Sequence, residues 1–151
     1  MSVWRICSRR HQVFDGEGAR RYGGRWNHPG TSIVYTSGSL SLAVLELFVH
    51  VDIDEIPANL VAIQSELPDQ LPIERVDLTD LPRNWRRYPA SEALKDIGTS
   101  WVIKASTAVL SVPSAVVPEE RNYLLNPAHR DFKRIQIHKP VAFQFDPRMW
   151  K

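Results

Sequence analysis

An arginine directly follows a glycine pair in the segment GARRYGGRWN, residues 18–27. Glycine lets a backbone approach a ligand closely, and a guanidinium binds phosphate oxygens through two parallel hydrogen bonds. The pattern around Arg25 therefore indicates an anion site, although a basic surface turn has the same composition. It is neither a GxGxxG nor a Walker motif, so it does not support an ordinary dinucleotide fold or a nucleoside triphosphatase.

A carboxylate interrupts an apolar helical pattern at Glu46, in LAVLELFVH, residues 42–50. It lies either at a solvated helix edge or in a cleft, partly desolvated and facing a developing positive charge. Shortly before it, Tyr35 stands in a β-branched segment. Its ring either packs on a sheet or stacks on a planar ligand, including a cationic one.

A second dense polar cluster occupies VPSAVVPEERNYLLNPAH, residues 112–129. Ser114, Asn122 and Asn126 stand there among prolines and apolar residues. A structural loop capped by asparagine side chains and a part of a binding site remain open as alternatives. Other chemistries have less support, since the five histidines show no paired ligand spacing, one cysteine cannot form a structural zinc site, and no GxSxG motif is present.

The composition is that of an ordinary globular protein, with 43% hydrophobic and 24% charged residues. Its 151 residues fit a single domain, 1–151. A formal net charge of +2 is too weak for a general nucleic-acid surface, and no apolar run is long enough to span a membrane. The N-terminus lacks the apolar stretch of a signal peptide, and the single Cys7 fits a reducing cytoplasm.

The apolar periodicity predicts short strands and two helices. The expected strands are 3–7, 31–37, 59–67, 72–78, 108–114, 133–139 and 141–146, and the expected helices are 40–51 and 89–105. Residues 8–31 are glycine-rich and predict a long loop. The helix over 40–51 is expected to be buried on most sides, and residues 135–145 to alternate as half-buried strands. This element order predicts an α+β fold with a mixed, mostly antiparallel sheet.

Several of these motifs together resemble the RES domain family. The resemblance rests on RYGGRWN (21–27), GTSIVYTS (30–37), SLAVLEL (41–47) and residues 112–129, and covers essentially the whole chain. Residues 52–105 carry no matching motif. The family takes its name from an arginine, a glutamate and a serine, which fall here on Arg25, Glu46 and Ser114.

The resemblance implies a toxin of a bacterial type II toxin–antitoxin pair, with a fold similar to ADP-ribosyltransferase toxins. Its implied partner is an Xre-like antitoxin with a helix-turn-helix region, in complexes that contain toxin dimers, with no direct nucleic-acid or membrane contact by the toxin. The implied substrate is NAD+, with no separate cofactor and no metal. Some members degrade NAD+ by hydrolysis or phosphorolysis, and others ADP-ribosylate a protein.

The resemblance also implies roles for individual residues. Arg25 would bind the diphosphate, Tyr35 would stack on the nicotinamide, and Glu46 would face the positive charge that develops on the ribose. Ser114 would hydrogen-bond the ligand or orient Arg25 or Glu46. Further predicted ligand contacts are Asn27, Arg21, Asn122 and Asn126.

The acceptor stays open between water, inorganic phosphate and a protein side chain. A phosphate acceptor would favour an extra cation, for which Arg20, Arg21 and Arg121 are candidates. The alternative of another class is a non-catalytic nucleotide or nucleic-acid binding module. Glu46 discriminates the two, because an anion-binding module gains nothing from a carboxylate in its cleft.

Overall fold

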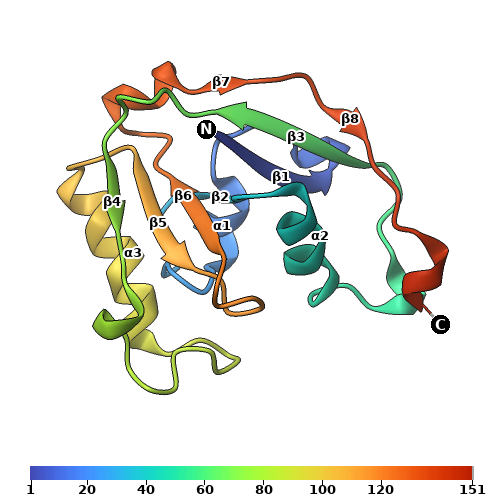
Figure 1. Ribbon diagram of the computed structural model, residues 1–151, viewed down its shortest axis with the longest axis horizontal. Helices are drawn as coiled ribbons and strands as arrows, with labels where there is room; N and C mark the ends of the chain where they lie inside the picture. Colours follow the sequence, from blue (N-terminus) through green and yellow to red (C-terminus); the bar gives the residue numbers. More distant parts are fainter. Residues whose placement is uncertain (151) are drawn as a thin grey trace.

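An eight-stranded sheet organises the part of the chain that the computed structural model describes, residues 1–150 (Figure 1). The strands are β1 (Ser2–Ser8), β2 (Val34–Ser37), β3 (Leu60–Glu66), β4 (Ile73–Arg75), β5 (Val109–Pro113), β6 (Arg121–Leu125), β7 (Gln136–Ile137) and β8 (Val141–Ala142). Their order is β4-β5-β6-β2-β1-β3-β7, and β8 also pairs with β3. Only the β4–β5 pair is parallel among the described strands. The predicted α+β class with a mixed, mostly antiparallel sheet is confirmed.

The sheet has two halves that meet where Trp4 of β1 pairs with Ser37 of β2. One half contains β2, β6, β5 and β4, and the other contains β1, β3, β7 and β8. Figure 1 shows helix α2 (Leu40–Phe48) beside β1, and helix α3 (Glu92–Lys104) beside β4 and β5. The two longer helices therefore flank different halves of the sheet.

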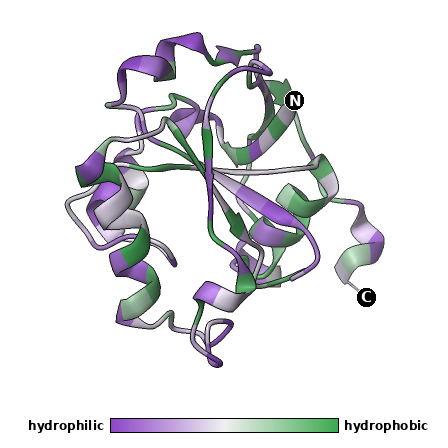
Figure 2. Ribbon diagram, turned by 60° about the vertical axis from the view of Figure 1, so that its left-hand side comes forward, coloured by the Kyte–Doolittle hydropathy of each residue, from purple (hydrophilic) through white to green (hydrophobic). Residues whose placement is uncertain are grey.

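Helix α2 begins where Ser39 Oγ accepts a hydrogen bond from the Leu42 N–H at 3.0 Å, which satisfies one of the free donors of the first turn. Leu42 and Ala43 are buried, but Leu45 and Val49 are 37% and 54% exposed. The helix is less buried than predicted: Leu40, Ala43, Val44, Leu47 and Phe48 pack in one cluster with Ile6 and Phe145, but Leu45 and Val49 face solvent. The helix is nonetheless hydrophobic along most of its length (Figure 2).

Helix α3 packs closely against the segment after Arg25. A Cβ on Gly98 would lie 1.9 Å from the Trp26 carbonyl oxygen, so only glycine allows this approach. The His28 N–H donates to Thr99 Oγ1 at 3.0 Å, one residue further along α3. Leu94 and Trp101 of the same helix are buried.

Two predictions about local structure were wrong. Residues 8–31 contain a helix, α1 (Glu17–Tyr22), where a long loop was expected. Glycine has low helix propensity, but Glu17 pairs with Arg20 and Arg21 across one turn and supports the helix locally. Strand β6 is absent from the expected strands, because the polar segment 112–129 is compatible with a structural loop or with part of a binding site, and its Leu124 and Leu125 are fully buried.

The last two strands are shorter than predicted. Strands β7 and β8 have two residues each and lie beside β3. Ile135 and Phe145 are buried as expected, but Ile137 and Val141 are 41% and 66% exposed. The alternating pattern thus marks the segment correctly, while pairing over only two residues leaves its outer side chains in solvent.

Candidate active site

A cleft of about 570 Å³ opens between the two halves of the sheet, which is within the range of about 300–1,000 Å³ that is usual for ligand pockets. Its walls come from β1, β2, α2, the glycine loop (residues 23–27) and the segment around Tyr88. Four of the residues singled out in the sequence line it: Arg25, Tyr35, Glu46 and Asn122. These residues are far apart in sequence, and the fold brings them to one cleft.

Two side chains fix the carboxylate of Glu46. Its Oε1 accepts hydrogen bonds from Ser114 Oγ and from Asn122 Nδ2, each at 2.7 Å. Ser114 is fully buried, and its Oγ also accepts from the N–H groups of Val116 and Val117 at 3.1 and 3.0 Å. A hydroxyl has one proton, so the Ser114 proton goes to Glu46. Of the two side chains that Ser114 was expected to orient, its hydroxyl is bonded to Glu46, whereas Arg25 is bonded to Trp85 and Arg87.

Asn122 is held in turn by the sheet. It lies opposite Ser37 in the β2–β6 pair, and its Oδ1 accepts from Ser37 Oγ at 2.8 Å. The amide is thereby oriented with its Nδ2 toward Glu46. Both donors reach the same carboxylate oxygen, and no hydrogen bond among the described residues reaches Oε2 of Glu46. That oxygen is available to a ligand in the cleft.

The hydroxyl of Tyr35 has a structural role. It accepts from the Trp26 N–H at 3.2 Å and donates to Asn27 Oδ1. Burial raises the pKa of Tyr35 above its ordinary value, so the phenol stays protonated. Its ring still lines the cleft and can stack on a planar ligand.

Asn27 lies behind Tyr35 and is fully buried. Its Nδ2 donates to the carbonyl oxygens of Ala19, His28 and Thr31 at 3.0–3.1 Å. This asparagine organises the glycine loop from within and is not part of the cleft wall. The structure thus gives Asn27 a positioning role, where the resemblance implied a ligand contact.

Arg25 connects the cleft to a segment that is distant in sequence. Its Nη1 donates to the carbonyl oxygens of Trp85 and Arg87, each at 3.0 Å. Burial lowers the pKa of Arg25 from its ordinary value, and the nearby Glu46 carboxylate acts in the opposite direction. An arginine in a protein remains charged, so Arg25 is a partly buried cation in the cleft.

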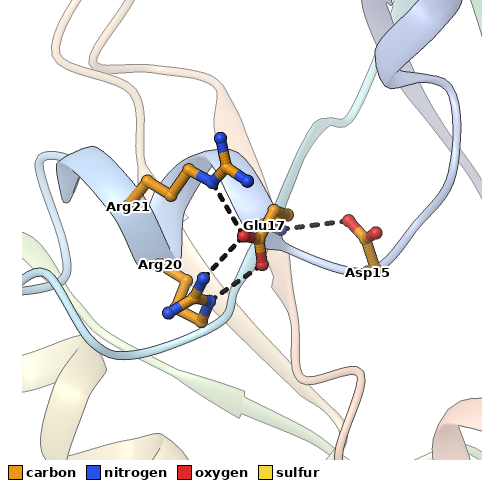
Figure 3. A network of polar contacts seen from close by, with 4 residues as sticks. All are labelled: Asp15, Glu17, Arg20 and Arg21. Carbon is orange, nitrogen blue, oxygen red and sulfur yellow. Dashed lines mark hydrogen bonds and ion pairs between the residues drawn. The ribbon is translucent and has the colours of Figure 1, made fainter.

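Two other predicted ligand contacts lie outside the cleft wall. Arg21 donates to Glu17 at 2.8 Å on the outer surface of α1, and its side chain is 61% exposed (Figure 3). Asn126 is buried, and its Oδ1 accepts from the Ala128 N–H at 3.0 Å in the turn after β6. The first is a surface ion pair, and the second stabilises a turn.

The cleft wall also contains residues that the sequence did not single out, among them Arg5, His50, Tyr88 and Lys95. The ring centroids of His50 and Tyr88 are 6.1 Å apart. Tyr88 and Lys95 fall in the region without a matching motif. For Lys95, the available signal in the sequence was its three-residue spacing from Gly98, because this spacing places the two residues on one face of a helix.

In this α+β fold a fixed carboxylate, a partly buried guanidinium and an aromatic ring share one open cleft, where the guanidinium can bind an anionic group and the ring can stack on a planar one. The RES domain family model matches residues 2–146, and the chain belongs to this family. The resemblance seen in the sequence is thereby confirmed.

Known proteins resemble this chain along nearly its whole length. Toxin Res of Yersinia enterocolitica is 41% identical over 152 residues, which cover 99% of each chain. The Prs ADP-ribosylating toxin of a Sphingobium species is 40% identical over 154 residues, which cover 98% of this chain and 96% of that protein. A chain in the crystal structure of the M. tuberculosis MbcT–MbcA toxin–antitoxin complex has the same fold, with a TM-score of 0.75 and 16% identity, covering 95% of this chain and 84% of that one. Among the described residues, no helix has the length and apolar character to cross a lipid bilayer.

Proposed function

We propose that this protein is the toxin of a type II toxin–antitoxin pair and consumes NAD+ by cleaving its nicotinamide–ribose bond. The observation that carries the proposal is the carboxylate of Glu46, held by Ser114 and Asn122 in the cleft that Arg25 and Tyr35 also line. The names of the 41% and 40% identical relatives, both described as toxins, agree with it.

The chemistry fits these side chains. When the bond between ribose and nicotinamide breaks, its electron pair stays on the pyridine nitrogen, so the leaving group becomes neutral and needs no proton. Positive charge develops on the ribose, and a fixed carboxylate stabilises it. Glu46 takes this role, the ring of Tyr35 stacks on the nicotinamide, and Arg25 binds the diphosphate.

The acceptor then forms a bond to the ribose carbon and loses a proton to solvent. Water gives ADP-ribose, and inorganic phosphate gives ADP-ribose 1″-phosphate. The relative named as an ADP-ribosylating toxin favours a second candidate, in which a protein side chain is the acceptor. These reactions share the bond that breaks and the residues that act on it.

Product analysis tests the proposal directly. Purified protein is incubated with NAD+ in buffer with and without phosphate, and with NAD+ plus cell extract, and nicotinamide and labelled products are separated. We expect nicotinamide release that falls roughly 100-fold in Glu46→Gln, since removing one fixed electrostatic group from a transition state has about this effect.

Glu119→Gln is the matched control, because this glutamate is exposed and outside the cleft wall, and should leave the rate unchanged. No nicotinamide release in any of the three mixtures would contradict the proposal. Binding of ADP-ribose without release would favour the non-catalytic nucleotide-binding alternative.

The proposed partner is an Xre-like antitoxin that covers the cleft, because a free NAD+-consuming enzyme in the cytoplasm would harm the cell that makes it. The fold shared with a chain of a toxin–antitoxin complex supports such a partner. If a neighbouring gene encodes a helix-turn-helix protein, its product should bind this chain and abolish nicotinamide release. Release that continues in the assembled complex would contradict the role of the antitoxin.

A further inference from the structure

Arg25 alone does not balance the negative charge of the proposed ligand. NAD+ carries a diphosphate with two negative charges, and Arg25 supplies one positive charge. Arg25 also directs its Nη1 to the carbonyl oxygens of Trp85 and Arg87, which leaves only part of its guanidinium for a ligand. A second cation in the cleft is therefore needed, a requirement that rests on the proposed function.

The arginines that the sequence offered for this purpose are engaged elsewhere. Arg20 donates to Glu17 through Nε and Nη2 at 2.8 and 2.6 Å, and Arg21 shares the same carboxylate (Figure 3). Arg121 donates to the carbonyl oxygens of Val76 and Ser111 at 2.6 and 2.9 Å. None of these three arginines belongs to the cleft wall.

Arg5 does line the cleft, but its guanidinium is also in use. The guanidinium carbon lies 5.4 Å from the centroid of the Phe14 ring, at cation–π distance, and Nη1 reaches the Val13 carbonyl oxygen at 3.5 Å. Arg5 stands on β1, whereas Arg25 stands in the glycine loop. Because the Arg5 guanidinium is engaged with Phe14 and Val13, we expect the second cation on another element.

Lys95 is placed to be that cation. It precedes Gly98 by three residues on α3, so both lie on the helix face that packs against Trp26, the residue after Arg25. Its side chain is 27% exposed and lines the cleft. Its ion pair with Glu92 spans 3.9 Å, and the Glu92 side chain is 76% exposed. Such an exposed pair contributes little and is easily exchanged for a ligand.

We propose that the ammonium group of Lys95 binds a phosphoryl group of the ligand beside Arg25, as a second cation of the cleft. Two sources share this chemistry, the diphosphate of NAD+ and an inorganic phosphate acceptor. The carboxylate of Glu46 is then left to face the ribose, while the phosphoryl charge is matched by Arg25 and Lys95. Because Lys95 binds the ligand, its loss should raise KM more than it lowers kcat.

The test compares Lys95→Ala with Lys104→Ala, an exposed lysine of the same helix outside the cleft wall. In one arm NAD+ is varied in phosphate-free buffer, and in the other phosphate is varied at saturating NAD+. We expect Lys95→Ala to raise the KM for NAD+ or for phosphate roughly tenfold, the effect of losing one charge-assisted hydrogen bond, with kcat little changed. The arm that responds identifies the source of the phosphoryl group.

A binding measurement separates this inference from the proposed function. If the NAD+ arm responds, calorimetry should show weaker ADP-ribose binding in Lys95→Ala, and if the phosphate arm responds, it should show weaker binding of inorganic phosphate. In either case the binding of adenosine, which has no phosphate, should be unchanged, and Lys95→Arg should recover the lost affinity. Wild-type KM values and wild-type affinities for ADP-ribose and inorganic phosphate in Lys95→Ala, with an active wild-type protein, would overturn the role of Lys95 alone. An equal loss of adenosine binding would also overturn it, since the effect would then be structural. A wild type that neither releases nicotinamide nor binds ADP-ribose would overturn the proposed function together with this inference.

Discussion

Ser114 and Glu46 are 68 residues apart in the sequence and are joined by a hydrogen bond of 2.7 Å between Oγ and Oε1. Ser114 is fully buried, so it does not contact a ligand from the cleft wall. On the proposed function, Ser114 would affect the reaction through the orientation of the carboxylate, which Asn122 of β6 also holds. The residues that give the family its name thus divide into two at the cleft and one behind it.

Ser114→Ala should lower the rate of nicotinamide release. Without its donor Glu46 is held by Asn122 alone, and a small misplacement of a catalytic group costs roughly 10- to 100-fold in kcat. The N–H groups of Val116 and Val117 also lose their acceptor, which should lower the free energy of unfolding by about 1–3 kcal/mol. Steady-state kinetics and urea unfolding measure the two effects.

Ser41→Ala provides the control for that variant. Ser41 is exposed on α2, five residues before Glu46. It should keep both the wild-type rate and the wild-type stability. A Ser114→Ala protein with an unchanged kcat would show that Asn122 suffices to orient the carboxylate.

The buried phenol of Tyr35 should make the protein sensitive to alkaline pH. Burial raises its pKa above the ordinary value of about 10, so the folded chain keeps a proton that the unfolded chain loses. This contribution to stability is fully present below pH 10 and is lost as the pH rises above it, by up to about 1.4 kcal/mol per pH unit. Urea unfolding between pH 8 and 11.5 should show a decline that is shallower in Tyr35→Phe. Equal slopes in the two proteins would argue against a buried, neutral Tyr35.

Gly98→Ala should destabilise the contact between α3 and the glycine loop. The added Cβ would meet the Trp26 carbonyl oxygen at 1.9 Å, and the backbone has to move to admit it. Overpacking of this kind costs about 1–3 kcal/mol. Because Arg25 and Lys95 lie on the two sides of this contact, the KM for NAD+ should rise as well.

Gly18→Ala is the matched glycine control. Gly18 lies in α1, and a Cβ there meets no atom within 4 Å among the described residues. Alanine has the higher helix propensity, so the free energy of unfolding should rise by about 0.5–1 kcal/mol. Thermal unfolding of Gly98→Ala and Gly18→Ala measures both effects. Equal melting temperatures of the two variants would refute the close approach at Gly98.

Arg21→Ala should leave the consumption of NAD+ unchanged. Arg21 lies four residues before Arg25, but it pairs with Glu17 on the outer surface of α1. Exposed ion pairs contribute about 0–1 kcal/mol, so stability should change little. The measurement is the KM for NAD+, which should stay within about twofold of the wild type, whereas a tenfold increase would place Arg21 at the ligand.

The sequence contained the chemically distinct residues and the element types around them. Glu46 stands out in an apolar helical pattern, and Arg25 stands out after two glycines. The period of the apolar residues also predicts α2, α3 and most of the strands, because it reflects which side of an element faces the core. The same period does not report how much of each side is covered, which is why Leu45 and Val49 turned out to be exposed.

Only the tertiary structure decided which of these residues act together. Strand pairing places Asn122 opposite Ser37 and turns its amide toward Glu46, and the close approach at Gly98 brings Lys95 to the same cleft as Arg25. Arg21 and Arg25 look alike in the sequence, yet one faces solvent beside Glu17 and the other enters the cleft. The physical reason is that local periodicity depends on neighbours along the chain, whereas a binding site depends on contacts between elements, and those contacts form only when the whole sheet assembles.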